Sequence, residues 1–497
     1  MHRFPGKWTR RSALLASALI VCSYVAFRVW RSDGQEGPPP LHALVALSTP
    51  KIIIGPNVHV SAANASEPHR ETVIAADPLQ AQWLFAFAMY ERTGKSAIAG
   101  YFSEDQGKSW KVSFEKQAEL GQLLCDPSAA FGPDGACYFV CLQLKSQVEN
   151  GEESQAGTKK SSMLFFRCSD GLAKWEPLAT VQHDNPTPPK DRAMPWQVRA
   201  DRPWLAIDNT SGKYRGRLYC ASWLWLDTSA DQGHTFANLP QPVRKEYKDY
   251  APANPVILSD GRLVLARRML SDRQHNLPGI GILMSDDGGQ TLCEGPLVGT
   301  NHYDQRLMFG SSFRFMPQLA VDSSASEYRD RVYAVWEDGR LQANTPPGQP
   351  ERPGPGRILF AYSEDKGKSW VEPMILSEQP DDGNNEYSAY MPAIAVNKAG
   401  HVAVTWYDRR GLPTAPGSRP PFYPSGCNVR MRVSQDGGET WQPSVQVNEK
   451  SIQASVWDLR DTAGLTADAV GTFHPVWSDD RAGTTQVWTA AVRVEKQ

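Results

Sequence analysis

The sequence has almost no excess of either charge: 52 lysines and arginines are matched by 54 aspartates and glutamates, for a formal net charge of -2 at pH 7. Nucleic-acid-binding domains usually carry a basic excess, so we expect no nucleic acid as a partner. Charged residues make up 21% of the chain and hydrophobic residues 41%, which excludes a disordered protein. The composition indicates a soluble globular protein with a large core.

Cysteine is scarce and irregularly spaced. Seven of the eight cysteines follow the N-terminal segment, and an odd number cannot be fully paired within one chain. We expect Cys137 and Cys168 on adjacent strands, where one disulfide would fit, but we favour buried cysteines that act as small hydrophobic residues. No spacing is typical of a structural zinc site. The sequence therefore predicts no metal and no required cofactor.

The apolar run at the N-terminus is short for a membrane span. Ala13–Phe27 follows several basic residues, as in an export signal or signal anchor, but a span usually needs about 17–25 residues. We assign residues 1–33 to the signal or anchor, and residues 34–50, with three consecutive prolines, to a tether. The protein is expected to be exported and to be membrane-anchored, periplasmic or extracellular. Cleavage and retention of the signal both stay open.

Beyond these absences, one short segment occurs again and again. Each copy places an Asp and a Gly in a tight turn between small polar residues and usually ends in an aromatic. The Asp can accept hydrogen bonds from backbone N–H groups of the turn, and Gly adopts backbone angles that other residues resist. The final aromatic is expected to wedge between neighbouring sheets. The copies are Ser103–Trp110, Ser229–Phe236, Ser363–Trp370 and Ser434–Trp441, with Ser285–Leu292 as a variant that lacks the aromatic.

The segments between these turns predict an array of short antiparallel strands. They are rich in Val, Ala and aromatics and are separated by Gly and Pro. Four-stranded units that repeat radially form a β-propeller, so we expect an all-β propeller over residues 51–497. Seven first strands favour seven blades, with six as the alternative if the third unit is incomplete. The last unit lacks a fourth strand, which Ile52–Ala62 could supply and so close the ring.

Blade geometry predicts two different rims. First strands begin and second strands end on one rim, whereas the repeated turns lie on the other. The long irregular insertions fall on the first rim, and such elaboration marks the working face of a scaffold. The insertions are Lys145–Lys160, His183–Ala200, Leu341–Gly356 and Gly411–Gly426.

The repeated S-x-D-x-G-x-[TS]-W turns in a propeller resemble the Asp-box (BNR) repeats of the sialidase, or neuraminidase, superfamily, over about Ile52 to Val494. This resemblance implies a glycosidase that holds the carboxylate of sialic acid with three arginines, whose planar forks suit bidentate binding. It further implies a Tyr nucleophile activated by Glu, in place of the usual carboxylate, and an Asp as acid and base.

Candidate site residues lie where the chain enters first strands on the working rim. Arg70, Arg202 and Arg314 are the candidates for carboxylate binding, although Arg202 and Arg314 could equally form structural ion pairs. Glu386 and Tyr390, with neighbouring Tyr387, offer the activator and nucleophile types, or simply line the funnel with aromatics. Asp126, Asp201 and Asp461 are alternatives for the proton donor or could cap strand starts.

A second set of arginines is expected to be structural. Arg340, Arg410 and Arg481 each end a related sequence, WEDGR, WYDRR and WSDDR. Because the pattern recurs, we favour salt bridges to the aspartates within those sequences over a role in the site.

These features give two leading hypotheses. The first is an exported, sialidase-like glycoside hydrolase that acts on terminal sialic acid or related acidic sugars. The alternative is a non-catalytic propeller that binds a glycan or a protein at the cell surface. The sialidase family usually has an Arg-Ile-Pro sequence at its first site arginine, and the absence of this sequence near the N-terminus favours the alternative. A hydrolase or lyase for another polysaccharide would share the same fold. A glycan or glycoconjugate is the expected ligand under all of these hypotheses, unless the non-catalytic propeller binds a protein instead.

Overall fold

The computed structural model describes residues 51–495, apart from internal gaps. The gaps are residues 146–147, 150–151, 154–159, 170–173, 184–200, 243–246, 272–278, 301–315, 339–355, 379–388, 411, 413–425, 455–458 and 460–462. The expected signal and tether, residues 1–50, therefore lie outside the described residues. Within the described ranges no helix is both long and apolar enough to cross a membrane.

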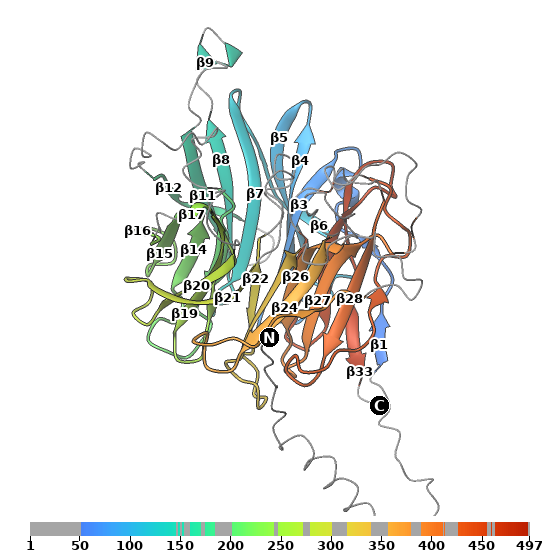
Figure 1. Ribbon diagram of the computed structural model, residues 1–497. Helices are drawn as coiled ribbons and strands as arrows, with labels where there is room; N and C mark the ends of the chain where they lie inside the picture. The colour runs from blue at the N-terminus through green and yellow to red at the C-terminus, as the bar shows by residue number, and fades with distance from the viewer. Residues whose placement is uncertain are drawn as a thin grey trace, which may run out of the picture. The chain divides into compact units, whose positions relative to one another are not determined.

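Seven antiparallel sheets, each with four main strands, follow one another along the chain (Figure 1). Blade 1 consists of β3 (His69–Ala76), β4 (Leu84–Arg92), β5 (Lys95–Ser103) and β6 (Lys111–Gln117). Blade 2 consists of β7 (Gln122–Phe131), β8 (Cys137–Lys145), β11 (Lys160–Cys168) and β12 (Glu176–Val181). Blade 3 consists of β13 (Trp204–Ile207), β14 (Leu218–Ser222), β15 (Trp225–Ser229) and β16 (Ala237–Pro240). In blade 4, β17 (Tyr247–Pro252) and β18 (Val256–Ile257) both pair with β19 (Leu263–Ser271), which is followed by β20 (Gly279–Ser285) and β21 (Cys293–Thr300). Blade 5 consists of β22 (Gln318–Val321), β23 (Val332–Asp338), β24 (Arg357–Ser363) and β25 (Met374–Ile375). Blade 6 consists of β26 (Ala389–Val396), β27 (Val402–Asp408), β28 (Asn428–Ser434) and β29 (Val445–Gln446).

The seventh blade joins the two ends of the described chain. Its own strands are β30 (Gly464–Ala467), β31 (Phe473–Asp479) and a third formed by β32 (Gln486–Thr489) and β33 (Val492–Glu495), which both pair with β31. The N-terminal strand β2 (Val58–His59) pairs with β32, and β1 (Lys51–Ile54) pairs with β33 from Lys51 opposite Glu495 to Ile54 opposite Val492. The expected closure by the segment after residue 51 is confirmed. A short 3-10 turn, η1 (Ala62–Asn64), then leads into blade 1.

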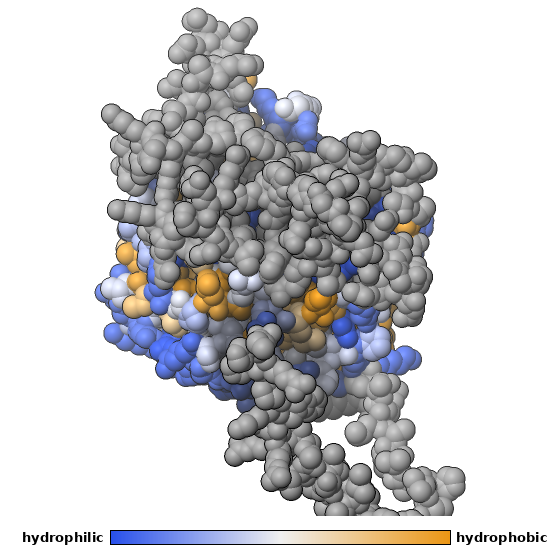
Figure 2. All heavy atoms as spheres, viewed as in Figure 1, coloured by the Kyte–Doolittle hydropathy of each residue, from blue (hydrophilic) through white to orange (hydrophobic). Residues whose placement is uncertain are grey.

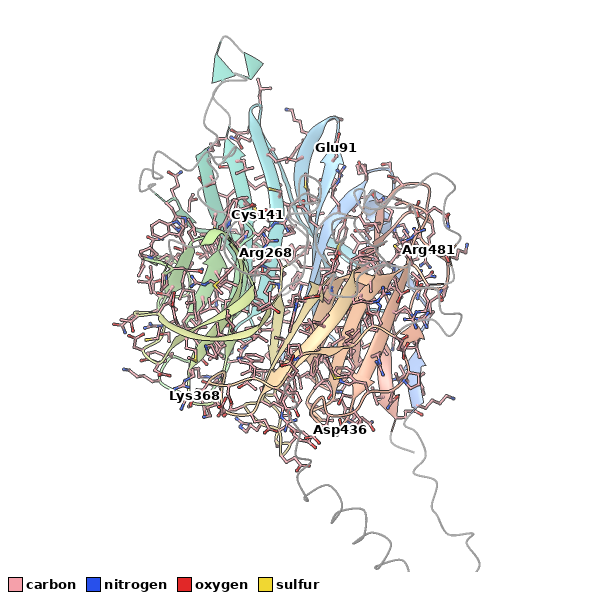
Figure 3. The ribbon with its side chains drawn as sticks, in the orientation of Figure 1. Glu91, Cys141, Arg268, Lys368, Asp436 and Arg481 are labelled. Carbon is pink, nitrogen blue, oxygen red and sulfur yellow. The ribbon has the colours of Figure 1, made fainter. Side chains whose placement is uncertain are left out.

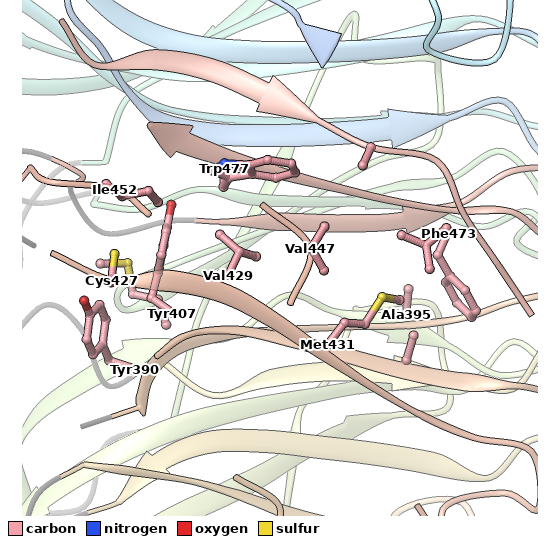
Figure 4. Close-up of a cluster of buried hydrophobic side chains, with 14 of the residues drawn as sticks. Tyr390, Ala395, Tyr407, Cys427, Val429, Met431, Val447, Ile452, Phe473 and Trp477 are labelled. Carbon is pink, nitrogen blue, oxygen red and sulfur yellow. The ribbon is translucent and has the colours of Figure 1, made fainter. Parts of the chain in front are cut away.

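Contacts between successive first strands run all the way around the ring. β3 contacts β7, β7 contacts β13, and the series continues through β18, β22, β26 and β30 back to β3. The seven-bladed all-β propeller is thus confirmed, and the third unit, which raised the six-blade alternative, is a complete four-stranded blade. Hydrophobic side chains fill the spaces between blades. One such core joins blades 6 and 7 through Met431, Phe473 and Trp477 (Figure 4).

The repeated turns have the hydrogen bonds that the sequence predicts. In the first, Asp105 Oδ1 accepts from the backbone N–H of Ser109 at 2.9 Å, and its Oδ2 accepts from the Ser109 hydroxyl at 2.6 Å. The Ser103 hydroxyl accepts from Gly107 N at 2.8 Å, where the glycine has a φ of 81°. Lys368 and Asp436, from two of these turns, lie at the end of the blades opposite Glu91 and Arg481 (Figure 3). We call these two ends the Asp-box rim and the loop rim.

The aromatic that ends a repeated turn does wedge against the preceding blade. Phe236 of blade 3 lies 4.3 Å from Phe165 of blade 2, and Trp441 of blade 6 lies 4.9 Å from Phe360 of blade 5, both measured between ring centroids. Trp175 does the same in blade 2, where it packs edge-on against Phe85. The turns therefore hold neighbouring blades together, and their role is structural.

Loss of an Asp-box carboxylate should destabilise the fold in a pH-dependent way. Hydrogen bonds from the Thr235 hydroxyl and backbone N–H lower the pKa of Asp231 to about 2, against about 3.9 in an unfolded chain. This carboxylate stabilises the fold above about pH 4, and that contribution disappears as the pH falls towards 2. We expect Asp231→Ala to lower the free energy of unfolding by about 1–2 kcal/mol at neutral pH, and by progressively less as the pH falls towards 2. Denaturant unfolding between pH 2 and 7 measures both values, with His234→Ala, an exposed residue of the same turn, as the control. A loss that is independent of pH would contradict the prediction.

The cysteines largely behave as small core residues. All seven after residue 51 have free thiols, and six are buried. Cys137 and Cys168 do lie directly opposite each other on β8 and β11, but they form no disulfide. Cys293 differs from the expectation, because it begins the outermost strand of blade 4 and is exposed.

The described surface is mainly polar. On the face in Figure 2, hydrophilic side chains predominate and hydrophobic ones form separate patches. The exposed large hydrophobic residues come from several blades, as expected for a folded protein. They are Leu79, Leu120, Leu224, Leu297, Met374 and Val470.

Candidate functional site

The loop rim carries the chain elaborations that the structure describes. The insertion after β8 forms a small hairpin of β9 (Val148–Glu149) and β10 (Glu152–Glu153), which extends beyond the blade at this end (Figure 1). The other three long insertions lie wholly or mostly outside the described residues. The inner strands that begin on this rim are well described, and they supply the candidate site.

Four first strands share an unusual backbone feature near the axis. Glu71, Asp126, Arg202 and Met391 have φ values of 57°, 50°, 51° and 52°, in the left-handed region that side chains other than Gly disfavour. In β3, β7 and β26 the ladder register shifts at these residues, so the strand carries a β-bulge. Strained backbone of this kind persists only where the surrounding structure enforces it, and it clusters at functional sites. Its recurrence in four blades shows that the inner strands are bent by one common device.

The bulges of β3 and β7 bring the carboxylate of Glu71 to the backbone of Asp126. Glu71 is buried, and its Oε2 accepts a hydrogen bond from the backbone N–H of Asp126 at 2.9 Å. Burial raises the pKa of the Cys125 thiol well above its usual value, and the charges of Asp126, Glu71 and Asp201 raise it further. The Cys125 sulfur lies 3.8 Å from Oδ2 of Asp126. Asp126 and Asp201, two candidates for the proton donor, are both half-buried.

Arg202 follows Asp201 in the sequence and reaches towards a distant blade. Its side chain is buried, and its Nη1 lies 3.8 Å from the sulfur of Met316, which precedes the first strand of blade 5. Blade 4 lies between these two blades, so the guanidinium extends across the inner end of blade 4 towards the axis. A buried guanidinium in this position can bind an anionic group of a ligand through a planar pair of N–H donors.

Arg70 lies nearer the edge of the loop rim. Its Nη2 is 3.5 Å from Oε2 of Glu91, at the end of β4, and about half of the Glu91 side chain is exposed. The structure thus pairs this arginine with a surface carboxylate. The other two candidates, Arg314 and Glu386, lie outside the described residues, as do the alternatives Tyr387 and Asp461.

Tyr390 lies in the hydrophobic core between blades 6 and 7, close to Tyr407 and Cys427 (Figure 4). Its ring centroid is 5.8 Å from that of Tyr407. Burial and the neighbouring Cys427 thiol raise the pKa of the Tyr390 phenol well above its usual value. An activated nucleophile needs the opposite shift, since the phenolate is the reactive form.

The arginines expected to be structural are paired as predicted where they are described. Arg410 Nη2 lies 2.8 Å from Oδ2 of Asp408, and Arg481 Nη2 lies 2.5 Å from Oδ2 of Asp479. Trp406 also donates its indole N–H to Asp408, at 3.0 Å. Arg340 falls outside the described residues.

Sequence reasoning missed several buried arginines on the loop rim. Arg268 and Arg357 are 2% and 0% exposed, and Arg409 is also buried, with its Nη1 donating to the carbonyl of Gly426 at 2.5 Å. Burial lowers the pKa of Arg409, whose charge faces Tyr390 and Cys427. The alternation of side chains along the end of a strand could have separated Arg409 from its neighbour Arg410, because Arg410 shares a face with Asp408.

Within the described residues no group of three or more His, Cys, Asp or Glu side chains has the geometry to hold a metal ion.

One family model matches the repeated turn. The BNR/Asp-box repeat family model matches residues 432–443, which contain the turn Ser434–Trp441. No curated protein matches the chain. Similar solved structures include the Hadza microbial sialidase Hz136, with 13% identity, 88% of this chain and 68% of that chain covered, and a TM-score of 0.42. A protein of unknown function from Dyadobacter fermentans has 11% identity, 90% and 100% coverage, and a TM-score of 0.49. The NanB sialidase from Streptococcus pneumoniae has 11% identity, 85% and 68% coverage, and a TM-score of 0.41. At these identities the likeness concerns the fold alone.

Proposed function

We propose that this BNR/Asp-box propeller is an exported, sialidase-like glycoside hydrolase that acts on terminal sialic acid or a related acidic sugar. The proposal rests on the buried Arg202, which follows Asp201 at the inner end of blade 3, and on Glu71, which accepts a hydrogen bond from the backbone N–H of Asp126. A planar guanidinium can bind a carboxylate in a bidentate manner. The sugar's negative charge would then lie on Arg202, with a carboxyl group at hand for proton transfer to the leaving group.

In this proposal the residues divide into two roles. Arg202 binds the substrate carboxylate, and Arg70 and Arg314 complete the cationic side of the site. Asp126 or Asp201 donates the proton to the glycosidic oxygen and later accepts one from water. The partner is a glycan or glycoconjugate outside the cytoplasm, reached through the export segment proposed for residues 1–33.

The direct test is release of 4-methylumbelliferone from its α-sialoside by the full-length protein, between pH 4 and pH 8. We expect turnover that requires Arg202 and is strongest on the acidic side, where a carboxyl group can be protonated. The same aglycone on a neutral β-glucoside should remain intact. Absence of turnover from a protein with a cooperative melting transition would count against the hydrolase.

The position of Tyr390 favours the alternative, a non-catalytic propeller that binds a glycan or protein at the cell surface. The phenol lies in the interblade core, and its raised pKa disfavours the phenolate. Binding of sialylated glycans without cleavage, weakened by Arg202→Ala, would support this alternative.

The variant Tyr390→Phe tests whether this phenol has a catalytic role. We expect it to keep sialoside turnover within about threefold, because a phenol held protonated in a core cannot act as a nucleophile. Its melting temperature should change little, since the ring is retained. Initial rates with the fluorogenic sialoside decide the question. A loss of about 100-fold or more in a folded variant would instead identify Tyr390 as the nucleophile.

A further inference from the structure

The turn that joins β14 to β15 exposes apolar side chains on the loop rim of blade 3. It consists of Trp223 and Leu224, and Trp225 begins the next strand. Leu224 is 38% exposed, and both tryptophans are half-buried. Large apolar side chains grouped on the surface beside polar groups often mark a binding site.

The backbone of this turn is held rigidly by one buried glutamine. Gln241 donates its backbone N–H to the carbonyl of Leu224 at 2.8 Å. Its side-chain Nε2 donates to the carbonyls of Ser222 and Trp225, at 3.2 and 3.0 Å. Three bonds from one residue fix the turn before any ligand arrives, which lowers the entropy cost of binding.

Trp225 is held in place by a buried polar pair, His183 and Asp227. Trp225 stacks on His183 with ring centroids 4.5 Å apart and an interplanar angle of 7°. His183 Nε2 lies 2.8 Å from Oδ1 of Asp227, which also accepts from Asn238 at 2.5 Å. These contacts hold the ring in one orientation, as a preorganised site requires.

The turn is next to the acidic and basic groups at the axis. The backbone N–H of Trp223 donates to the carbonyl of Asp201 at 3.3 Å, and Asp201 is adjacent to Arg202 in the sequence. A ligand group bound on the turn would therefore lie beside the segment from which Arg202 extends towards the axis. It would lie further from the axis, since the turn joins the second and third strands of the blade.

We propose that the turn Ser222–Trp225 is a stacking platform for a neutral pyranose ring, the sugar next to the acidic one. This inference rests on the proposed function for its placement of the acidic sugar. One face of a pyranose ring presents C–H groups, which pack favourably against an aromatic ring or Leu. The four residues of the turn carry no charge, so the platform favours a neutral ring. It supplies affinity for the part of a glycan that leaves when the terminal bond breaks.

The experiment is saturation-transfer NMR of the full-length protein with lactose and with cellobiose. We expect transfer to ring C–H protons of at least one disaccharide in the wild type. Trp223→Ala and Leu224→Ala should weaken the binding by about tenfold, whereas Trp223→Phe should largely preserve it. Leu297→Ala, at an exposed position on the outer strand of blade 4, is the matched control and should bind as the wild type does.

Two results would overturn the platform. One is the absence of transfer to either disaccharide, and the other is binding that Trp223→Ala and Leu224→Ala leave unchanged in folded proteins. Thermal melting identifies any variant that fails to fold, and Leu224→Ala is the safer of the two because its side chain is partly exposed. Neutral-sugar binding does not require turnover. A protein that binds lactose through Trp223 but cleaves no sialoside would therefore support the platform and overturn the hydrolase.

Discussion

Replacing Arg202 with alanine is expected to lower kcat/KM for an α-sialoside by roughly 30- to 5,000-fold. Truncating one partner of a buried charge pair costs about 2–5 kcal/mol, and each 1.36 kcal/mol is a factor of ten in rate. The Arg202 side chain is 8% exposed, so its loss would leave the substrate carboxylate without a buried counter-charge. Steady-state kinetics with the fluorogenic sialoside give the value.

Two variants control this experiment. Arg202→Lys keeps the charge but loses the planar fork, so it should recover only part of the lost activity. Arg262→Ala removes a guanidinium that pairs with the exposed Asp286, and turnover should not change. Equal kinetic constants for Arg202→Ala and the wild type would place the substrate carboxylate elsewhere in the molecule.

Replacing Asp126 with asparagine should lower kcat by about 100- to 10,000-fold, the usual contribution of a positioned general acid or base. Asn keeps the shape of the side chain but carries no transferable proton. The backbone N–H of Asp126 would still donate to Glu71, so the bulge in β7 should persist. The remaining activity should also lose its fall with rising pH, because no general acid is left to deprotonate, and a merely structural change would not remove that fall.

Asp201→Asn identifies which of the two neighbouring aspartates is the acid. We expect it to reduce kcat less than Asp126→Asn, with a larger effect on KM, because Asp201 adjoins the substrate-binding Arg202. A leaving group that is already acidic needs little protonation, so p-nitrophenyl substrates should be less affected by the variant at the acid. The reverse ranking would assign the proton donor to Asp201.

The sequence was sufficient for the fold because its repeated signals are local. Asp105 and its equivalents specify a turn through bonds within a few residues, and each turn marks the third and fourth strands of a blade. The ring closure could also be predicted, since the last unit lacked a strand and Ile52–Ala62 had no other partner. The expectation of mostly buried cysteines is confirmed, and Cys293 is the exception because its position at the start of an edge strand depends on sheet order, which strand propensity does not encode.

The site was harder to predict because it depends on backbone bends and strand faces. Nothing local in the sequence announces the left-handed φ at Glu71 or Asp126, yet those bulges determine which carboxylates meet. Tyr390 was placed on the working rim by its position in the chain, but the side of the strand on which it lies puts it in the core. The pattern WYDRR predicted the salt bridge of Arg410 with Asp408, but it did not indicate that the neighbouring Arg409 is buried.

The seam between β1 and β33 also has a mechanical consequence. If residues 1–33 hold the protein to a bilayer, any tension on the tether enters the propeller at Lys51, opposite Glu495. A pull along β1 would load its backbone hydrogen bonds to β33 together, in shear, instead of breaking them one after another. The strands that complete the toroid would then also bear the load from the cell envelope.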